Sequence, residues 1–406
     1  MVNSTKVGGG VAVLLQSIVP YLNQLGVRTE WLVLEGDTDF FSVTKSFHNA
    51  LQGEVMADIL EQIKGYDVFY NERFDSLNVH LNDHFSNLSG SDIVVIHDPQ
   101  PLKLIAKRKD DGSKWIWRTH IDTSNPDDEL WDFVFKYAMK FDAAIASKRD
   151  FTRGRGLNWV TIPPSIDPLA SKNRLMEKEE VKKILSEFNI PLDKPLITQV
   201  SRLDKWKDPL GVIQAFDLLR DKYNIDCSLA LVYNGATDDP EGGMMLQLVQ
   251  EQKENSSYKN DIHLIWGDNQ DVVNAFQTGS DLVMQKSLRE GFALTVSEAL
   301  WKATPVIGTK VGGIPLQIKH GHNGFLVDAC ALDETDQTKK RHHLEQVAYY
   351  MYEIISDPAR AKEMGKNAHE FVRENFLVSR HIKDYLILFN NLAGSDEHQA
   401  MLSDKY

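Results

Sequence analysis

Short apolar runs rich in valine and isoleucine recur along this chain, and segments with the apolar period of a helix separate them. Such runs, bounded by polar turns, predict strands buried on both faces. We expect strands at Val2–Ser4, Trp31–Glu35, Ile93–Ile96, Trp115–Trp117, Ala143–Ala146, Trp159–Ile162, Leu196–Val200, Leu229–Val232, Ile262–Trp266, Asp281–Met284, Pro305–Ile307 and Phe325–Val327, and helices at Val11–Leu25, Pro209–Lys222 and Ala293–Lys302. This alternation predicts an α/β fold with parallel sheets.

The segment Pro163–Pro168 is the best internal boundary, because its three prolines can continue neither a helix nor a central strand. Each side holds enough residues for one doubly wound domain. We therefore predict two Rossmann-like domains facing a cleft: residues 1–168 plus 376–406, and residues 169–375. The last predicted helix, Asn375–Asn391, returns to the first domain. Ligands of open α/β sheets bind beyond the carboxyl ends of the strands, so motifs that follow strands are the candidates for a site.

Charge narrows the classes of partner. The 406 residues include 45 Lys or Arg and 58 Asp or Glu, giving a net charge of −13. An acidic chain without a block of basic residues is a poor match for nucleic acid or an anionic membrane. No apolar run approaches the roughly 20 residues that span a bilayer, and the start lacks the pattern of a signal peptide. Cys227 and Cys330 show no metal spacing, so we expect a reduced, cytoplasmic protein without a metal site.

Two motifs could bind phosphate. Gly8–Gly10 opens a predicted helix, where backbone N–H groups and the helix N-terminus attract anions, although a tight turn is the simpler interpretation. Arg202 and Lys207 follow the strand Leu196–Val200 and could together hold a diphosphate. A solvated, charged loop is the alternative for this pair.

The sharpest motif is the segment Glu290–Glu298, which contains two glutamates eight positions apart across a strand-to-helix turn. Gly291 permits the bend, Glu290 lies on the loop, and Glu298 lies about one turn into the helix. Both carboxylates could accept hydrogen bonds from sugar hydroxyls, with phosphate on the N–H groups of the first turn. An exposed glutamate and a glutamate on a helix face are the plain alternative.

Polar residues also end the strands of the first domain. His120 follows Trp115–Trp117 and could be a general base, a hydrogen-bond donor or a core histidine. Asp98 follows Ile93–Ile96 and could bind hydroxyls or cap a helix. The polar cluster Lys45–Asn49 could be a hydroxyl-binding loop or a cap. Asp238 and Asp239 resemble a metal-binding pair only loosely and instead favour a helix start at Pro240.

These motifs together resemble those of the retaining glycosyltransferases of family 4, which have the GT-B fold. The residues that carry the resemblance are Glu290, Glu298, Arg202, Lys207 and His120, with the glycine turn. Several strings resemble the trehalose synthase and trehalose phosphorylase branch of that family. They are Val2–Thr5 followed by GGGVA, Glu35–Thr38, Phe47–Gly53, His97–Pro101, Trp117–Asp122, Pro163–Pro168 and Asp238–Gly242.

The resemblance implies a role for each candidate. His120, Arg202, Lys207 and Glu290 would be catalytic, with Arg202 and Lys207 holding the diphosphate and His120 bonding the 6-hydroxyl of the donor glucose. Donor and nucleotide would contact Gly9, Gly10, Arg202, Lys207, Glu290, Gly291, Phe292, Ala293, Leu294 and Glu298, the last through ribose. The acceptor glucose would contact Lys45, His48, Asn49 and Asp98.

The implied reaction moves glucose from an NDP-glucose, UDP- or ADP-glucose, to glucose and forms α,α-trehalose by front-side displacement. No metal or other cofactor is implied, since Arg and Lys take the place of Mg²⁺. A trehalose phosphorylase and a non-catalytic sugar-binding protein of the same fold are the alternatives. Ala293 departs from the glycine usual in the family. The chain begins almost inside its first strand, so we expect a segment of close relatives to be missing, which bears on a possible homodimer.

Overall fold

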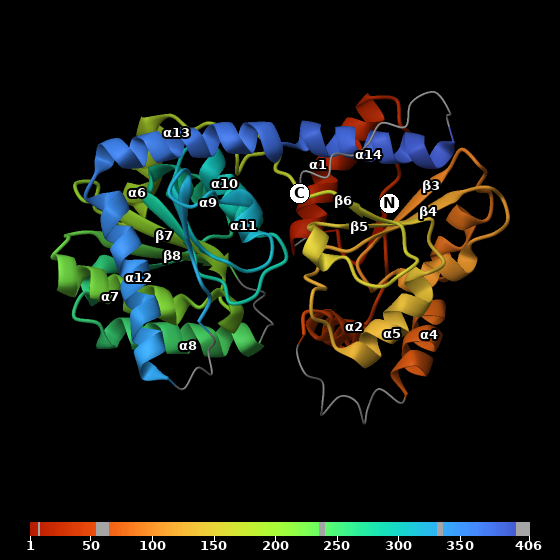
Figure 1. Ribbon diagram of the computed structural model, residues 1–406, viewed down its shortest axis with the longest axis horizontal. Helices are drawn as coiled ribbons and strands as arrows, with labels where there is room; N and C mark the ends of the chain where they lie inside the picture. Colours follow the sequence, from red (N-terminus) through yellow and green to blue (C-terminus); the bar gives the residue numbers. More distant parts are fainter. Residues whose placement is uncertain (7–8, 54–64, 235–239, 331–335, 395–406) are drawn as a thin grey trace. The chain divides into compact units, whose positions relative to one another are not determined.

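The computed structural model describes residues 1–6, 9–53, 65–234, 240–330 and 336–394. The chain divides into two compact units (Figure 1). Unit 1 consists of Met1–Ser165 with Val378–Tyr406, and unit 2 of Ile166–Leu377. The sequence-based prediction placed these divisions after residues 168 and 375.

Unit 1 contains a parallel sheet with the strand order β2-β1-β3-β4-β5-β6. Its strands are β1 (Val2–Asn3), β2 (Leu32–Val33), β3 (Ile93–His97), β4 (Lys114–Arg118), β5 (Ala143–Ala146) and β6 (Trp159–Thr161). Its helices are α1 (Gly9–Gln24), α2 (Thr38–Leu51), α4 (Tyr66–Leu77), α5 (Asp128–Ala138), α14 (Val378–Ala393) and the short 3₁₀ segments η1 (Val79–Leu81), η2 (Asp83–Phe85), η3 (Leu102–Lys107) and η4 (Arg149–Phe151).

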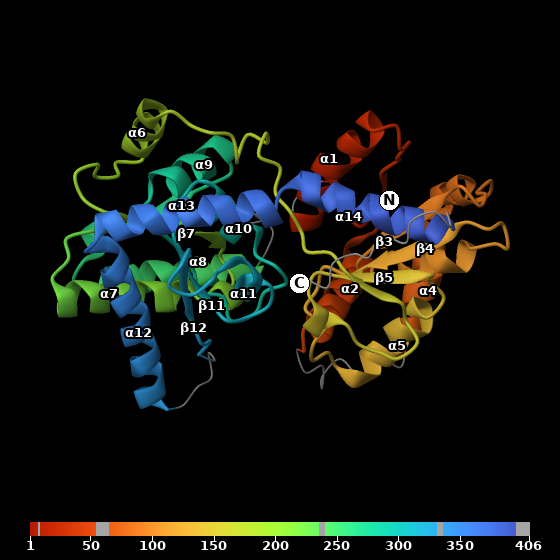
Figure 2. The same cartoon turned by 45° about the horizontal axis from the view of Figure 1, so that its top comes forward.

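The sheet of unit 1 is covered on both faces. Trp115 and Trp117 of β4 pack with aromatic side chains of α2, α4 and α5 in one core. Ile116 faces the other way and packs with α1 and α14 in a second core. Helix α14 lies beside α1 in both views (Figures 1 and 2). The last helix therefore completes a layer that the first helix begins.

Unit 2 contains a second parallel sheet, with the order β12-β11-β10-β7-β8-β9. Its strands are β7 (Leu196–Arg202), β8 (Ser228–Asn234), β9 (Ile262–Trp266), β10 (Leu282–Gln285), β11 (Val306–Thr309) and β12 (Gly324–Val327). Its helices are α6 (Lys178–Glu187), α7 (Pro209–Tyr223), α8 (Pro240–Asn255), α9 (Gln270–Gly279), α10 (Leu294–Trp301), α11 (Ile314–Gln317), α12 (Gln337–Ile355), α13 (Pro358–Asn375), and the short segments η5 (Lys205–Lys207) and η6 (Lys259–Asp261).

Helices also cover both faces of this sheet. Side chains of α7 and α12 form one core with β7, β10 and β11, whereas those of α6 and α9 pack on β7, β8 and β9. The two pairs of helices lie on opposite sides of the sheet (Figure 2). Two parallel sheets with helices on both faces confirm the predicted pair of Rossmann-like domains. In the described part of the chain, no helix is long and apolar enough to cross a membrane.

Each predicted strand has a counterpart within a few residues of its predicted bounds. Two predictions about helices were wrong. The Lys45–Asn49 cluster lies inside α2, not in a loop, because Asp37 caps this helix and Phe40, Phe47 and Leu51 are buried at helical spacing. The last helix begins at Val378, since Asn375 ends α13. Asp238 and Asp239 lie outside the described residues, and α8 does begin at Pro240.

Candidate active site

The loop that follows β10 brings Glu290 against Lys207 in unit 2. The Lys207 ammonium is paired with Glu290 Oε2, and both side chains are only about 15% exposed. Ser287 Oγ donates to the same oxygen at 3.2 Å. Gln285 Nε2 lies 3.4 Å from it. A carboxylate, an ammonium and two polar side chains thus meet beyond the carboxyl ends of β7 and β10, the edge of the sheet where ligands bind.

Arg202 lies apart from this group. Its side chain is 71% exposed, and its guanidinium lies 3.3 Å from Asp204. Asp204 is mostly buried, but the guanidinium itself is exposed, so it can exchange Asp204 for another anion. The backbone carbonyl of Lys207 accepts a hydrogen bond of 2.8 Å from Gln199 of β7, which ties the segment that carries Lys207 to the strand that ends at Arg202.

The turn between Glu290 and α10 contains a residue in a strained conformation. Ala293 has φ +67°, in the left-handed region that usually favours glycine. The bend therefore lies at Ala293, whereas the sequence suggested Gly291. Helix α10 begins at Leu294 and has no side-chain cap, so the N–H groups of its first turn have no partner four residues back within the helix. Phe292 and Ala293 are buried.

Two glycines of the β11–α11 loop hold this turn in place. Gly313 N–H donates to the carbonyl of Gly291 at 2.9 Å. A Cβ on Gly312 would lie 1.8 Å from the carbonyl oxygen of Glu290, closer than any side chain permits, and Gly312 itself has φ +54°. Only glycine leaves room for the Glu290 backbone at this position.

We predict that Gly312→Ala lowers kcat by about 100-fold, because displacing the Glu290 backbone by about 1 Å misplaces the side chain. Gly321→Ala is the matched control: Gly321 also has positive φ, +76°, but a Cβ there meets nothing within 4 Å. Both variants place a side chain at positive φ, but only Gly312→Ala also meets backbone, so it should lose more stability than Gly321→Ala, and it alone should lose activity. Equal kcat values for the two variants, with thermal unfolding as the check on folding, would contradict this account.

Glu298 lies on α10 but does not face an open surface. Its side chain is 2% exposed, and its carboxylate is paired with the ammonium of Lys172. Burial raises the pKa of Glu298, but Lys172 and Lys302 lower it more, so the pKa lies below its usual value. Burial lowers the pKa of Lys302 to about 7. The sequence suggested a carboxylate facing the ligand, whereas here it is already paired.

In unit 1, Asp98 and His120 lie together at the ends of β3 and β4. Asp98 Oδ1 accepts a 2.8 Å hydrogen bond from the backbone N–H of His120, and the Asp98 backbone is left-handed, with φ +64°. The short segment η3 that follows begins after Pro101 and has no side-chain cap, so Asp98 is not a helix cap, one of the two roles considered for it. Burial raises the pKa of Asp98 to about 7.

His120 is also in contact with a second histidine. Its Nε2 lies 3.0 Å from Nδ1 of His97, and the two rings are stacked. Burial, assisted by the positive charge of Arg118, lowers the pKa of both rings well below the usual value. Both are thus neutral near pH 7, and His120 can donate or accept a hydrogen bond but does not carry a charge.

The other predicted residues of unit 1 lie on α1 and α2. Gly9 (φ +76°) and Gly10 are exposed at the start of α1, and Gly8 lies outside the described residues. Lys45, His48 and Asn49 lie on α2, with Lys45 exposed and His48 Nε2 3.1 Å from Gln52. Because Lys45, His48 and Asn49 lie on a helix, the distances between their side chains are set by helix geometry and not by a flexible loop.

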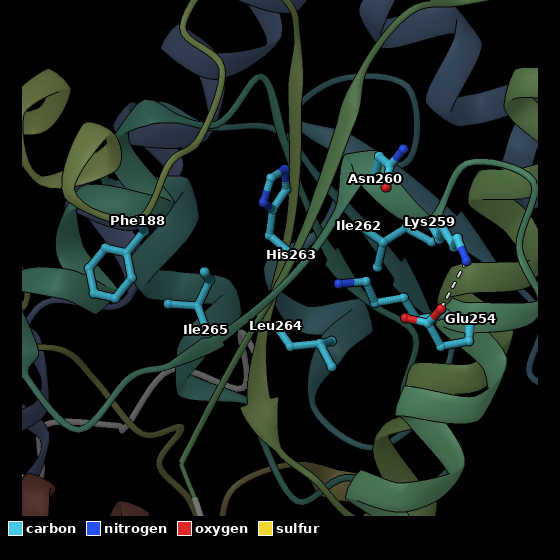
Figure 3. Close-up of a pocket in the computed structure, with 9 residues that line it drawn as sticks. Phe188, Glu254, Lys259, Asn260, Ile262, His263, Leu264 and Ile265 are labelled. Carbon is cyan, nitrogen blue, oxygen red and sulfur yellow. Dashed lines mark hydrogen bonds and ion pairs between the residues drawn. The ribbon is translucent and has the colours of Figure 1, made fainter.

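A hollow of about 520 Å³ lies at the edge strand β9, away from all these residues. Figure 3 shows the side chains that line it, with Lys259 paired to Glu254 at 3.0 Å. It contains none of the predicted site residues. Within the described part of the chain, no group of three or more His, Cys, Asp or Glu residues could hold a metal ion.

Two family models match this chain. Residues 1–153 match the family model "Trehalose synthase, N-terminal domain", and residues 180–371 match "Glycosyl transferases group 1". A trehalose synthase of Pyrococcus horikoshii is 41% identical over 97% of this chain and 89% of its own length. The chain belongs to the trehalose synthase family of glycosyltransferases. A trehalose synthase of Rubrobacter xylanophilus is 38% identical over 97% of this chain and 90% of its own length.

Less similar proteins show which fold this member of the trehalose synthase family has. A Rickettsia africae glycosyltransferase aligns with a TM-score of 0.69 at 17% identity, over 97% of this chain and 98% of the other. Anabaena HepE in complex with UDP-glucose aligns with a TM-score of 0.66 at 15% identity, over 96% and 98%. These likenesses confirm the GT-B fold. A trehalose phosphorylase of Pleurotus pulmonarius is 27% identical over 92% of this chain but 54% of its own length.

Sequence reasoning missed residues that support the site of this trehalose synthase family member. Lys286 is 3% exposed and paired with Asp208, which has φ +46° and accepts a 3.0 Å bond from the Gly211 N–H at the start of α7. Lys172 and Gly312 were missed too. The Gly312–Gly313 pair was the one visible signal, since adjacent glycines before a short helix often mark a close approach of backbones.

Proposed function

We propose that this protein is a retaining glucosyltransferase of family 4 that moves glucose from UDP- or ADP-glucose to a second glucose, forming α,α-trehalose. The observation that carries the proposal is the contact of Lys207 with Glu290 at the carboxyl ends of β7 and β10. One group there can hold a diphosphate and its neighbour a sugar hydroxyl. The similarity to proteins named trehalose synthase supports the product.

In this proposal the donor diphosphate replaces Glu290 as the partner of Lys207. The exposed Arg202 adds a second cation, and the first N–H groups of α10 contribute their positive end. Together they stabilise the charge that develops as the bond between the anomeric carbon and the phosphate oxygen breaks. These cations would do what Mg²⁺ does elsewhere, so we propose that the reaction needs no metal.

Glu290, released from Lys207, accepts hydrogen bonds from hydroxyls of the donor glucose near the reacting carbon. The acceptor hydroxyl attacks from the side on which the diphosphate leaves, which retains the configuration. The proton of that hydroxyl passes to the departing phosphate oxygen, so charge and atoms balance. His120, neutral at pH 7, bonds the 6-hydroxyl of the donor glucose, and Asp98 fixes its backbone.

We also propose that Glu298 holds the ribose hydroxyls of the nucleotide. Lys172 occupies its carboxylate in the structure, so ribose would bind beside this ion pair or replace Lys172. A phosphorylase acting on trehalose and phosphate would have no ribose for Glu298, and this is the point at which the two activities differ.

The direct test incubates the protein with UDP-glucose or ADP-glucose and glucose, and identifies the products by NMR. We expect α,α-trehalose and one equivalent of NDP. Incubation of trehalose with phosphate, without nucleotide, is the control, and it should release no glucose phosphate. Glucose phosphate formed in the control, without NDP release from any donor, would establish the phosphorylase instead. Absence of both reactions would favour a sugar-binding protein.

A further inference from the structure

Arg118, the last residue of β4, is completely buried and has an unusual lack of partners. Its Nε and both terminal nitrogens find no hydrogen-bond partner among the described residues. It alternates with the tryptophans of β4 and so lies on the same face of the sheet as Ile116, which packs with α1 and α14. The function proposed above makes no use of this guanidinium.

Three more buried polar groups without partners lie close enough to feel its charge. They are His97 Nε2 at the end of β3, and His381 Nε2 and the Tyr385 hydroxyl on α14. The His381 and Tyr385 rings are stacked, with centroids 5.1 Å apart. His381 Nδ1 lies 2.9 Å from Ser165 Oγ, so its Nε2 is the nitrogen left over. We call Arg118, His97, His381 and Tyr385 the Arg118 cluster.

Among the residues that the structure describes, no carboxylate contacts the Arg118 guanidinium. Asp384 is paired with Arg380 at 2.8 Å, and Arg380 also donates to the carbonyls of Pro163 and Pro164. Asp98 does not contact Arg118 and interacts with it only by longer-range electrostatics. The Asp98 Oδ1 accepts a hydrogen bond from the His120 N–H, and burial raises the pKa of Asp98 to about 7.

An unpaired cation in such surroundings is unfavourable. The neighbouring core consists of side chains such as Ile116, Ile145 and Ile382. The effective cost of burying one ion without a partner is several kcal/mol, which exceeds what water alone would recover by hydrogen bonding. An anion would neutralise the charge of the Arg118 guanidinium and would also accept hydrogen bonds from its N–H groups.

We propose that the Arg118 cluster binds a small monovalent anion of the halide class inside unit 1. The guanidinium supplies the charge, and Tyr385 O–H and the Nε2–H groups of His381 and His97 supply further donors. Solvent does not reach these side chains, which favours an ion of a single atom, and one cation favours a single negative charge.

The anion would also fix the histidine pair. If His97 donates from Nε2 to the anion, its Nδ1 is an acceptor, so the proton in the 3.0 Å contact belongs to Nε2 of His120. Nδ1 of His120 is then a hydrogen-bond acceptor. The buried ion therefore determines which nitrogen of His120 is able to accept a hydrogen bond from a hydroxyl group.

Crystals of the full chain grown in sodium bromide test the site directly, because bromide scatters anomalously. We expect an anomalous peak at about 3.3 Å from a guanidinium nitrogen of Arg118 and near the Tyr385 hydroxyl. A cluster that contains only water, without anomalous signal, would overturn the proposal.

Thermal unfolding gives an independent test in solution. At constant ionic strength, replacing gluconate, which is too large to enter, by chloride at about 30 times its dissociation constant should raise Tm by about 5 °C. Tyr385→Phe removes one donor, so the chloride concentration needed for the same rise in Tm should be at least about ten-fold higher. Tyr70→Phe is the control, because this buried hydroxyl of unit 1 already contacts the carbonyls of Pro99 and Gln100.

The control should lower Tm equally in both salts and leave the chloride dependence unchanged. Equal chloride dependence in wild type and Tyr385→Phe would contradict the proposal, as would equal Tm values of the wild type in chloride and gluconate. Neither test depends on whether the protein makes trehalose.

Discussion

Glu290→Gln is expected to lower kcat for glucosyl transfer by a factor of about 10² to 10³ while changing the dissociation constant of the nucleotide by only a few-fold. The substitution keeps the shape of the side chain and removes its charge. Glu290 Oε2 is held by Lys207, Ser287 and Gln285. We therefore expect the carboxylate to act on the donor sugar in the transition state and not on the nucleotide.

The measurement is steady-state kinetics with UDP- or ADP-glucose, together with calorimetric binding of the free nucleotide. Glu179→Gln is a suitable control, because Glu179 is an exposed glutamate of unit 2 that is paired with Lys182. It should leave kcat and binding unchanged. If kcat and nucleotide affinity fall together in Glu290→Gln, Glu290 has a shared binding role or the variant is unfolded, and thermal unfolding separates these outcomes.

The second large effect is a steep loss of stability of unit 1 on acidification. Burial lowers the pKa of His97, His120 and His381 below the ordinary 6.5. Below pH 6.5 these histidines are therefore protonated in the unfolded chain but stay neutral in the folded chain, and the free energy of unfolding decreases as the pH falls. Asp98 opposes this, because its pKa is raised from 3.8 to about 7, and it takes up a proton in the folded state first.

On unfolding, the three histidines bind three protons and Asp98 releases one, so the chain takes up a net two protons. The expected slope just below the unfolded pKa of 6.5, between pH 6 and pH 5, is about 2–3 kcal/mol per pH unit. Hydrogen exchange of the β3 and β4 amides in gluconate buffer measures it. His381→Phe should roughly halve the slope, whereas replacement of His84, whose side chain is 42% exposed, should not alter it. Constant protection from pH 7 to pH 5 would contradict the assignment.

The strands were predictable because the signal for a buried parallel strand is local. A run such as Ile262–Trp266 carries its own pattern, and the structure has the same bounds. The prediction of a loop at Lys45–Asn49 was wrong because it rested on the polar residues and not on the apolar positions that make α2 a helix. That error could have been avoided, since Phe40, Phe47 and Leu51 already have helical spacing.

The candidate site was predictable only in part. Glu290 and Lys207 each follow a strand, and the order of the strands brings them together. The pairing of Glu298 with Lys172 could not be predicted, because Lys172 belongs to a segment without a repeating pattern. Arg118 gave no signal either: a basic residue at the end of a strand is usually exposed, and only the packing of α14 shows that this one is buried.

The position of α14 in unit 1 has a consequence for biosynthesis. Its residues Val378, Ile382 and Tyr385 cover the same face of the sheet as α1. During translation the part of this face that α14 covers stays exposed until all of Ile166–Leu377 has been made, which takes roughly 10–40 s at typical elongation rates. Unit 2 is continuous in sequence and is able to fold in that interval. The half of the protein that emerges first from the ribosome is therefore the half that matures last, and its exposed apolar face is where chaperones would bind to the nascent chain.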